Sequence, residues 1–404
     1  MDQLFGVGAP DGGGLEPMTE TELSSPGGNG CMRTRLILVG GFLGAGKTTL
    51  LLHAARLLTE RGYRVGLVTN DQGEDLVDTA LTADWEIPVT EVAGGCFCCR
   101  FPDLIKALRR LQKSVNPDVI LAEPVGSCTD LMATVLLPLH LYYPGQFQIA
   151  PLTILIDPGR RSADFPATVD YLYRKQLAEA EIIVLNKSDI LDANQRQAEL
   201  AALKAVHSHS QLMSLSARSG EGVAEWLEIL LAQSSRVARV LELDYARYAG
   251  AEAALGWLNA KGALRARSPF SVTRWVEDLL HTLEQSFTNQ NAPIAHIKVH
   301  VTTPTATVKA SLTQAGSPVS WDSWATDADT DRAQFIVNAR VNTDPRTLGR
   351  TVRRTIEALT PAPDFHCDFT HFECFSPLPP QPTYRLAPNA VPLSSTTVSD
   401  SERN

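Results

Sequence analysis

The sequence lacks any apolar run that approaches the roughly 20 residues a helix needs to cross a bilayer. Its amino terminus also lacks the basic and apolar regions of a secretory signal. Basic side chains are the minority, since 36 Lys and Arg stand against 45 Asp and Glu and give a formal net charge of −9. Nucleic acids and anionic membranes select a basic face, so this balance argues against both as partners. We therefore expect a cytoplasmic protein that binds neither.

Cysteine is too sparse for a fold built on disulfides. The chain has seven, an odd number, and no secretion signal accompanies them. Three of them, Cys96, Cys98 and Cys99, follow Gly94 and Gly95 within a few residues. Such crowding favours thiolate chemistry or a metal over a disulfide. The remaining cysteines are Cys31, Cys128, Cys367 and Cys374.

Apolar runs and helical stretches alternate between residues 34 and 236. Near-continuous apolar strands separated by helices indicate an α/β domain with a mostly parallel sheet flanked by helices. The expected strands are 35–40, 64–69, 118–123, 152–157, 181–186 and 211–214, and the expected helices include 46–60, 102–113, 193–205 and 222–232.

Residues 250–375 show a different pattern. Their β-α-β-β-β-α-β order predicts a smaller α+β domain with a partly antiparallel sheet. Residues 1–33 are predicted to be a disordered leader and residues 376–404 a disordered tail, because Gly, Pro and Ser enrich them.

The first apolar strand runs into a complete G-x-x-x-x-G-K-[ST] loop, which identifies residues 34–236 as a P-loop NTPase domain. Its glycines let backbone N–H groups point at phosphate oxygens, and the following helix adds its positive end. Lys47 is expected to reach the β- and γ-phosphates and Thr48 to bind Mg²⁺. The predicted phosphate-binding residues are Gly41, Gly44, Ala45, Gly46, Lys47, Thr48 and Thr49.

An N-K-x-D string, Asn186-Lys187-Ser188-Asp189, follows a later strand. A carboxylate such as that of Asp189 accepts two hydrogen bonds from guanine that adenine does not offer, which favours GTP over ATP. Ser216 and Ala217 follow the next strand, and the Ala217 N–H is expected to meet the guanine carbonyl oxygen. An ordinary solvated turn is the alternative for such a short string.

Glu123 ends strand 118–123, and Gly126 follows it three residues later. This spacing suits a carboxylate that holds Mg²⁺ and a glycine that senses the γ-phosphate. A plain strand-end turn is the alternative, because Pro124 and Gly126 both form turns. Ser127 stands where many GTPases keep a water-positioning glutamine, so we expect slow intrinsic hydrolysis and leave the activating group open.

The C-x-C-C string can supply three soft ligands to Zn²⁺ or a similar ion. A closed structural site would want a fourth ligand, and none is adjacent in the sequence. Three small buried apolar residues are the alternative. Cys128, just past Gly126, is either a small buried residue or a residue near the switch.

GFLGAGKTTLL, C-F-C-C, Glu123-x-x-Gly126 and N-K-S-D, in that order, resemble the CobW-like GTPases of the CobW/HypB/UreG group. The resemblance covers about residues 35–235. It implies a GTP-hydrolysing metallochaperone that takes up Zn²⁺, or Co²⁺ or Ni²⁺, at the thiols and delivers it to a client metalloprotein. Asn70-Asp71-Gln72-Gly73-Glu74 occupies the place of a family switch with two substitutions, and the family's His-rich loop is absent.

Two rival functions remain: a GTP-regulated binding module with structural or redox-sensitive thiols, and an ATP-dependent P-loop enzyme. The oligomeric state is open, including a homo-oligomer. His366, Cys367, His371 and Cys374 are too far apart along a strand to share one ion, so we expect ordinary packing there. His207 and His209 are expected to be a solvated pair.

Overall fold

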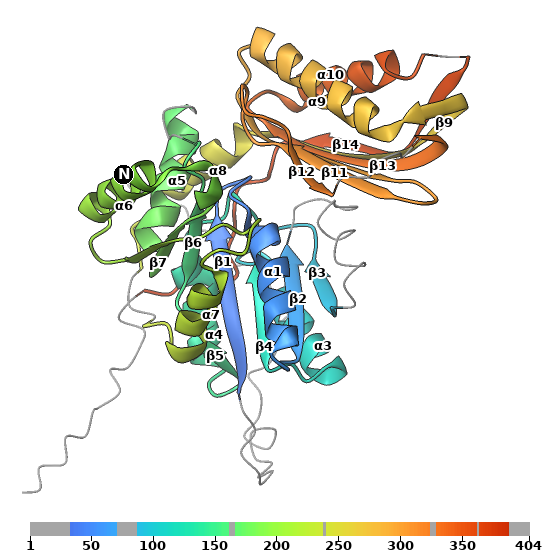
Figure 1. Cartoon of the computed structure of the whole chain (residues 1–404). Helices are drawn as coiled ribbons and strands as arrows, with labels where there is room; N and C mark the ends of the chain where they lie inside the picture. Colours follow the sequence, from blue (N-terminus) through green and yellow to red (C-terminus); the bar gives the residue numbers. More distant parts are fainter. Residues whose placement is uncertain are drawn as a thin grey trace, which may run out of the picture. The chain divides into compact units, whose positions relative to one another are not determined.

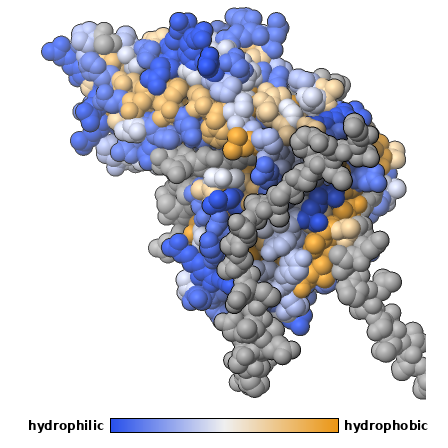
Figure 2. All heavy atoms as spheres, turned by 180° about the vertical axis from the view of Figure 1, so that it is seen from behind, coloured by the Kyte–Doolittle hydropathy of each residue, from blue (hydrophilic) through white to orange (hydrophobic). Residues whose placement is uncertain are grey.

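The computed structural model describes residues 33–70, 87–160, 166–236, 240–323, 329–361 and 363–387 (Figure 1). The predicted leader, apart from Arg33, lies outside these ranges, and so do residues 71–74 of the expected switch. None of the described helices combines the length and hydropathy of a membrane-spanning segment. Hydrophilic and hydrophobic side chains are interspersed on the face shown in Figure 2.

The first sheet has eight strands in the order β3-β2-β4-β1-β6-β7-β8, with β5 paired to β1, and its strand pairs are parallel. This confirms the predicted parallel α/β architecture. The strands are β1 (Thr34–Gly41), β2 (Val65–Asn70), β3 (Val89–Val92), β4 (Val119–Glu123), β5 (Phe147–Ile149), β6 (Thr153–Ile156), β7 (Ile182–Leu185) and β8 (Gln211–Ser214).

Helices cover both faces of this sheet. Successive side chains of a buried strand point to opposite sides, so each face needs helices to cover its apolar side chains. Leu36 and Leu38 of β1 enter one core cluster with α3, whereas Ile37 and Val39 enter another with α1 and α7. The helical elements are α1 (Lys47–Glu60), α3 (Phe101–Ser114), η2 (Met132–Leu136), α4 (Leu137–Tyr142), α5 (Ala167–Glu179), η4 (Ser188–Ile190), α6 (Ala193–Val206), α7 (Val223–Ala232) and α8 (Tyr245–Ala253).

The second sheet has six strands in the order β12-β11-β10-β13-β9-β14. All its strand pairs are antiparallel. The sequence predicts a sheet that is only partly antiparallel. Its elements are β9 (Gly256–Ser271), α9 (Val272–Asn289), β10 (Ile294–Thr302), β11 (Thr307–Leu312), β12 (Ser320–Ser323), β13 (Asp329–Val341), α10 (Pro345–Ala358) and β14 (Phe365–Phe375).

The second sheet has one apolar face and one polar face. Ile297 and Val299 of β10 enter the core cluster that includes α9 and α10, and both helices lie on one side of this sheet (Figure 1). Strand alternation therefore directs His296 and Lys298 to the other side. The Arg160 guanidinium, placed just after β6, donates to the carbonyl oxygens of Ala295 and Thr313 and so ties the two sheets together.

The chain after β14 differs from the predicted disordered tail. The Thr383 N–H donates to the Cys98 carbonyl oxygen at 2.9 Å, and the Leu386 N–H donates to that of Ala133 at 3.0 Å. The Arg385 guanidinium lies 2.7 Å from the buried Asp130 carboxylate. Backbone N–H groups of this segment therefore pair with the loop that carries Cys98 and with η2 (Met132–Leu136). Residues 388–404 lie outside the described ranges.

A buried carboxyl makes stability depend on pH. Burial raises the pKa of Glu179 to about 8, while the Thr129 hydroxyl and the Met132 N–H donate to its oxygens. The folded state keeps a proton that the unfolded chain releases above its ordinary pKa of 4.5. The free energy of unfolding should therefore fall as pH rises from about 5 to about 8.

Glu179→Gln should flatten this dependence, because an amide preserves the shape and cannot ionise. Denaturant midpoints measured across that pH range check the prediction, with the exposed Glu225→Gln as the matched control. Parallel pH profiles for the wild type and Glu179→Gln would contradict it.

Candidate nucleotide and metal site

The phosphate loop connects the end of β1 to the start of α1 at Lys47. Gly46 has a φ of +92°, and a Cβ there would lie 2.3 Å from Asn186 Nδ2. Gly41 has a φ of +132°, and a Cβ there would lie 2.5 Å from the Leu155 carbonyl oxygen. Glycine is required at both positions by backbone conformation and by close neighbours.

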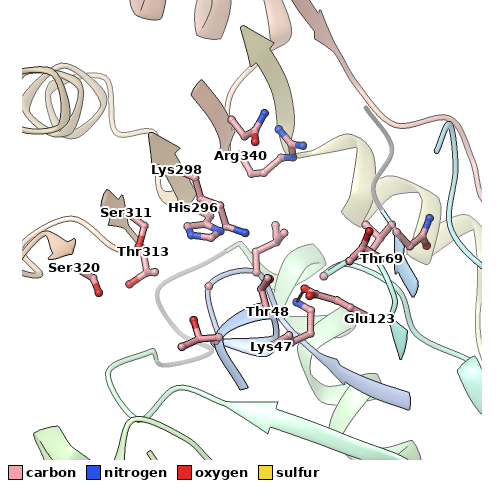
Figure 3. Close-up of a pocket in the computed structure, with 18 of the residues that line it drawn as sticks. Lys47, Thr48, Thr69, Glu123, His296, Lys298, Ser311, Thr313, Ser320 and Arg340 are labelled. Carbon is pink, nitrogen blue, oxygen red and sulfur yellow. Dashed lines mark ion pairs between the residues drawn. The ribbon is translucent and has the colours of Figure 1, made fainter. Parts of the chain in front are cut away.

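A cavity lies against this loop (Figure 3). The polar face of the second sheet forms part of its wall, and His296 and Lys298 point toward the loop that carries Lys47 and Thr48. Of the residues predicted to bind phosphate, base or Mg²⁺, those that line this cavity are Gly44, Gly46, Lys47, Thr48, Thr49, Glu123, Gly126 and Lys187.

Lys47 and Glu123 face each other in this cavity. Lys47 Nζ donates to the Gly41 carbonyl oxygen at 3.0 Å and lies 3.7 Å from Glu123 Oε1. Both side chains are largely buried.

The sequence does not single out the cationic second-sheet residues Lys298, Lys309 and Arg340 that also line the cavity, because no motif marks them. Burial lowers the pKa of His296 well below its usual range.

The N-K-x-D string is joined to the phosphate loop through Asn186. Its Nδ2 donates to the Ala45 carbonyl oxygen at 2.7 Å, and its Oδ1 accepts from the Ala217 N–H at 2.9 Å. Lys187 has a φ of +55°, and its Nζ lies 2.5 Å from Asp157 Oδ2. The structure thus brings together two of the segments predicted to hold the base.

Six predicted residues lie outside the lining of this cavity: Gly41, Ala45, Asn186, Asp189, Ser216 and Ala217. Four of these six still take part in the hydrogen bonds described above: Gly41, Ala45, Asn186 and Ala217. Asp189 is exposed, on η4, and Ser216 is fully buried, with its hydroxyl accepting from the Ser219 N–H at 3.1 Å.

The loop between β3 and α3 gathers three thiols. Cys96 Sγ lies 2.7 Å from Cys98 Sγ and 3.1 Å from Cys99 Sγ, and the last two sulfurs are 3.8 Å apart. Cys96 and Cys98 are buried and Cys99 is half-buried. The Gln381 N–H, from the segment after β14, donates to Cys99 Sγ at 3.2 Å. Among the described residues, this is the cluster whose ligand atoms converge closely enough to hold a metal ion.

Hydrogen bonding within the cluster shifts the pKa values of its thiols in opposite directions. Hydrogen bonds from Cys128, then Cys98 and Cys99, hold the pKa of the Cys96 thiol well below its usual range. The hydrogen bond with Cys96 correspondingly raises the pKa of Cys99 to about 12. Cys128 comes from the segment after β4 and is buried in the same core cluster as Cys96 and Cys98.

Asn70, the last residue of β2, connects the cavity to the thiols. It lines the cavity. Its Nδ2 donates to the carbonyl oxygens of Val92 and Gly95, both at 2.7 Å, and its Oδ1 accepts from the Phe97 N–H at 2.8 Å. One buried amide therefore fixes both ends of the turn that presents Cys96. The sequence marks Asn70 only as the first residue of the expected switch.

The other histidines and cysteines form no comparable site within the described part of the chain. Cys367 and Cys374 pack beside the second core, and a Cβ on Gly349 would lie 2.8 Å from Cys374 Sγ. His207 and His209 meet edge to face, with ring centroids 6.1 Å apart.

The fold and this loop define a P-loop-type nucleotide-binding α/β domain joined to an antiparallel-sheet domain. Residues 35–214 match the family model described as CobW/HypB/UreG, nucleotide-binding domain. The chain therefore carries a nucleotide-binding domain of that family.

Three curated relatives support this assignment. The zinc chaperone YeiR of Escherichia coli (strain K12) is 38% identical over 169 residues, which cover 41% of this chain and 50% of the relative. The zinc chaperone CobW of Sinorhizobium sp is 28% identical, covering 46% and 60%. CobW of Pseudomonas aeruginosa (strain PAO1) is 30% identical, covering 39% and 49%. The chain thus spans about half to three fifths of the length of these relatives.

Replacing Asn70 by alanine should loosen the thiol loop. The Phe97 N–H and two carbonyl groups would lose their partner, at a cost of about 2 kcal/mol in the free energy of unfolding. Cys96 and Cys98 should also react faster with a thiol reagent. Urea unfolding and mass-resolved alkylation check both effects, with the exposed Asn194→Ala as control. Unchanged alkylation rates would show that Asn70 does not hold the loop.

Proposed function

We propose that this chain is a GTP-binding and GTP-hydrolysing metallochaperone, which binds a divalent transition metal at Cys96, Cys98 and Cys99 and couples GTP turnover to metal delivery. The observation that carries the proposal is the position of Asn70. Its side chain lines the nucleotide cavity and also holds the loop that bears the thiols. A nucleotide bound in the cavity can therefore affect the thiol loop, and a metal bound at the thiols can affect the cavity.

Phosphate binding is assigned to the loop residues Gly41, Gly44, Ala45, Gly46, Lys47, Thr48 and Thr49. Lys47 supplies the positive charge, and the backbone N–H groups at the start of α1 supply donors. Thr48 and Glu123 both line the cavity and offer hard oxygen ligands, which fit Mg²⁺. When bound, Mg²⁺ would neutralise charge on the transferred phosphoryl group. Gly126 would meet the γ-phosphate.

Guanine selection is assigned to Asp189, with Asn186, Lys187, Ser216 and Ala217 shaping the loops around the base. The exposed Asp189 carboxylate is available to accept the two guanine donors. The Asn186 amide, bonded to Ala45 and Ala217, fixes the base loops to the phosphate loop. This arrangement supports GTP over the ATP-dependent alternative.

Slow intrinsic hydrolysis is consistent with Ser127. It is fully buried, and its hydroxyl donates to Glu252 Oε1 at 2.5 Å. Burial raises the pKa of Glu252 to about 8. The Ser127 hydroxyl thus points to α8 and not to the nucleotide cavity. Ser127 is therefore not placed to orient the attacking water.

The metal is proposed to be Zn²⁺, with Co²⁺ or Ni²⁺ as alternatives, because thiolates are soft ligands. The three relatives reported above are named zinc chaperones, which supports Zn²⁺. A client metalloprotein would receive the ion in the cytoplasm. The rival function, a GTP-regulated binding module with redox-sensitive thiols, predicts no influence of nucleotide on metal affinity.

Metal titration with and without nucleotide tests the coupling. Zn²⁺ affinity of the wild type should differ at least about fivefold between a non-hydrolysable GTP analogue and GDP, because coupling requires differential affinity. Replacing Cys96, Cys98 and Cys99 together by serine should abolish binding, whereas Cys367→Ser should leave it intact. Equal affinities in both nucleotide states would favour the rival binding module.

Asp189→Asn tests the base assignment. An amide can donate to xanthine where the carboxylate accepts from guanine, so preference should move from GTP toward xanthosine triphosphate by on the order of a hundredfold. Competition binding measures the change, and the exposed Glu199→Gln on α6 should retain GTP preference. Equal competition by ATP and GTP in the wild type would overturn the guanine assignment.

A further inference from the structure

The segment that follows β14 lies across the thiol loop, and residues 381–386 of this segment are here called the strap. The Gln381 N–H donates to Cys99 Sγ at 3.2 Å, and the Thr383 N–H donates to the Cys98 carbonyl oxygen at 2.9 Å. The Thr383 hydroxyl donates to the Cys99 carbonyl oxygen at 3.2 Å. The first half of the strap therefore bonds both the backbone and one sulfur of the loop.

The second half of the strap is anchored beside the same loop. The Tyr384 ring meets the Phe101 ring edge to face, with centroids 5.3 Å apart, and its centroid lies 5.1 Å from that of Tyr142. Arg385 forms the ion pair with the buried Asp130 carboxylate described above. Phe101 begins α3, directly after the thiol loop. These anchors hold the strap over the loop.

The strap lies on the surface, and most of its side chains are exposed. Pro380 and Pro382 flank Gln381. Proline fixes φ and has no N–H, so this stretch keeps an extended form without pairing into a sheet. A segment that is already restricted loses less conformational freedom when it docks. The strap can therefore leave and return without unfolding either sheet.

The strap lies at the accessible side of the thiol cluster. Cys96 and Cys98 are buried, whereas Cys99 is half-buried, and its sulfur is the one that accepts from the strap. The three sulfurs converge closely enough to hold an ion. An ion that reaches them from solvent approaches on the side of Cys99, where the strap lies.

We propose that the strap is a gate on the thiol site, which slows the passage of the metal in both directions until the strap is displaced. This inference rests on the proposed metallochaperone function and adds a controlled step to it. A client that accepts the ion brings its own ligand to the same side of the cluster. Docking of the client and release of the strap are therefore linked.

The surface beneath the strap indicates the chemistry of such a client. It offers carbonyl oxygens of the thiol loop, the aromatic rings of Phe101 and Tyr142, and the Asp130 carboxylate. This surface fits an extended segment that supplies backbone N–H groups, an aromatic side chain and a basic side chain, as the strap itself does.

Alkylation of the metal-free full chain, resolved by mass for each cysteine, tests the gate without any metal. Thr383→Pro removes both donors to the loop carbonyls and should speed the reaction of Cys99 by at least about fivefold, the effect of one lost hydrogen bond. Arg385→Ala, at the other end of the strap, should act in the same direction. Leu378→Pro, at an exposed residue before the strap, should leave the rate unchanged. The half-buried Cys367 is the internal control for unfolding.

Unchanged Cys99 rates in both strap variants would overturn the gate. Stopped-flow transfer of Zn²⁺ to and from a chelator gives a second readout. In Thr383→Pro the association and dissociation rates should rise together, so that Kd changes less than either rate. Faster dissociation alone, with a matching loss of affinity, would show that the strap stabilises the bound ion and would contradict a gate.

The failure of the proposed function has a different signature. If the triple serine variant of Cys96, Cys98 and Cys99 bound Zn²⁺ normally, the metallochaperone proposal would fail. The alkylation rates of the metal-free chain would still show whether the strap controls access to Cys99.

Discussion

The side-chain amide of Asn70 is the constraint on which the arrangement of the site depends. A glycine-containing loop that crowds three thiols has no secondary structure of its own to hold it, and its backbone groups need partners in the buried interior. Asn70 supplies them from the end of β2, a strand fixed between β3 and β4 in the sheet. Because β2 ends at the carboxyl edge of a parallel sheet, the same side chain reaches the cavity beside the phosphate loop.

The turn from Val125 to Cys128 borders the same cavity, since Val125 and Gly126 line it. It follows β4, the strand between β2 and β1, so Asn70 and this turn lie at the ends of adjacent strands, at the edge where ligands of parallel sheets bind. The polar face of the second sheet adds Lys298 and Lys309 to the cavity wall, which makes the cavity suitable for an anionic ligand.

The parts of this site that are local in sequence could be predicted. The loop from Gly41 to Thr48 and the string beginning at Asn186 are short motifs whose conformation follows from their own residues, and six strands of the first sheet were located within two residues. The short strands β3 and β5 were missed, because four or three residues carry too little pattern. The Gln381 contact to Cys99 could not be derived, since it joins residues 282 positions apart. The outer half of β9 is polar and is defined by pairing with β13 and β14, not by an apolar run.

We propose that Asn70 transmits nucleotide occupancy of the cavity to the thiols. The most direct measurement is the ratio of Zn²⁺ affinities with a non-hydrolysable GTP analogue and with GDP, determined for the wild type and for Asn70→Ala by chelator competition. We expect a ratio different from one in the wild type and a ratio closer to one in Asn70→Ala, with GTP still bound by both proteins. A wild-type ratio of one, or the same ratio in Asn70→Ala as in the wild type, would contradict it.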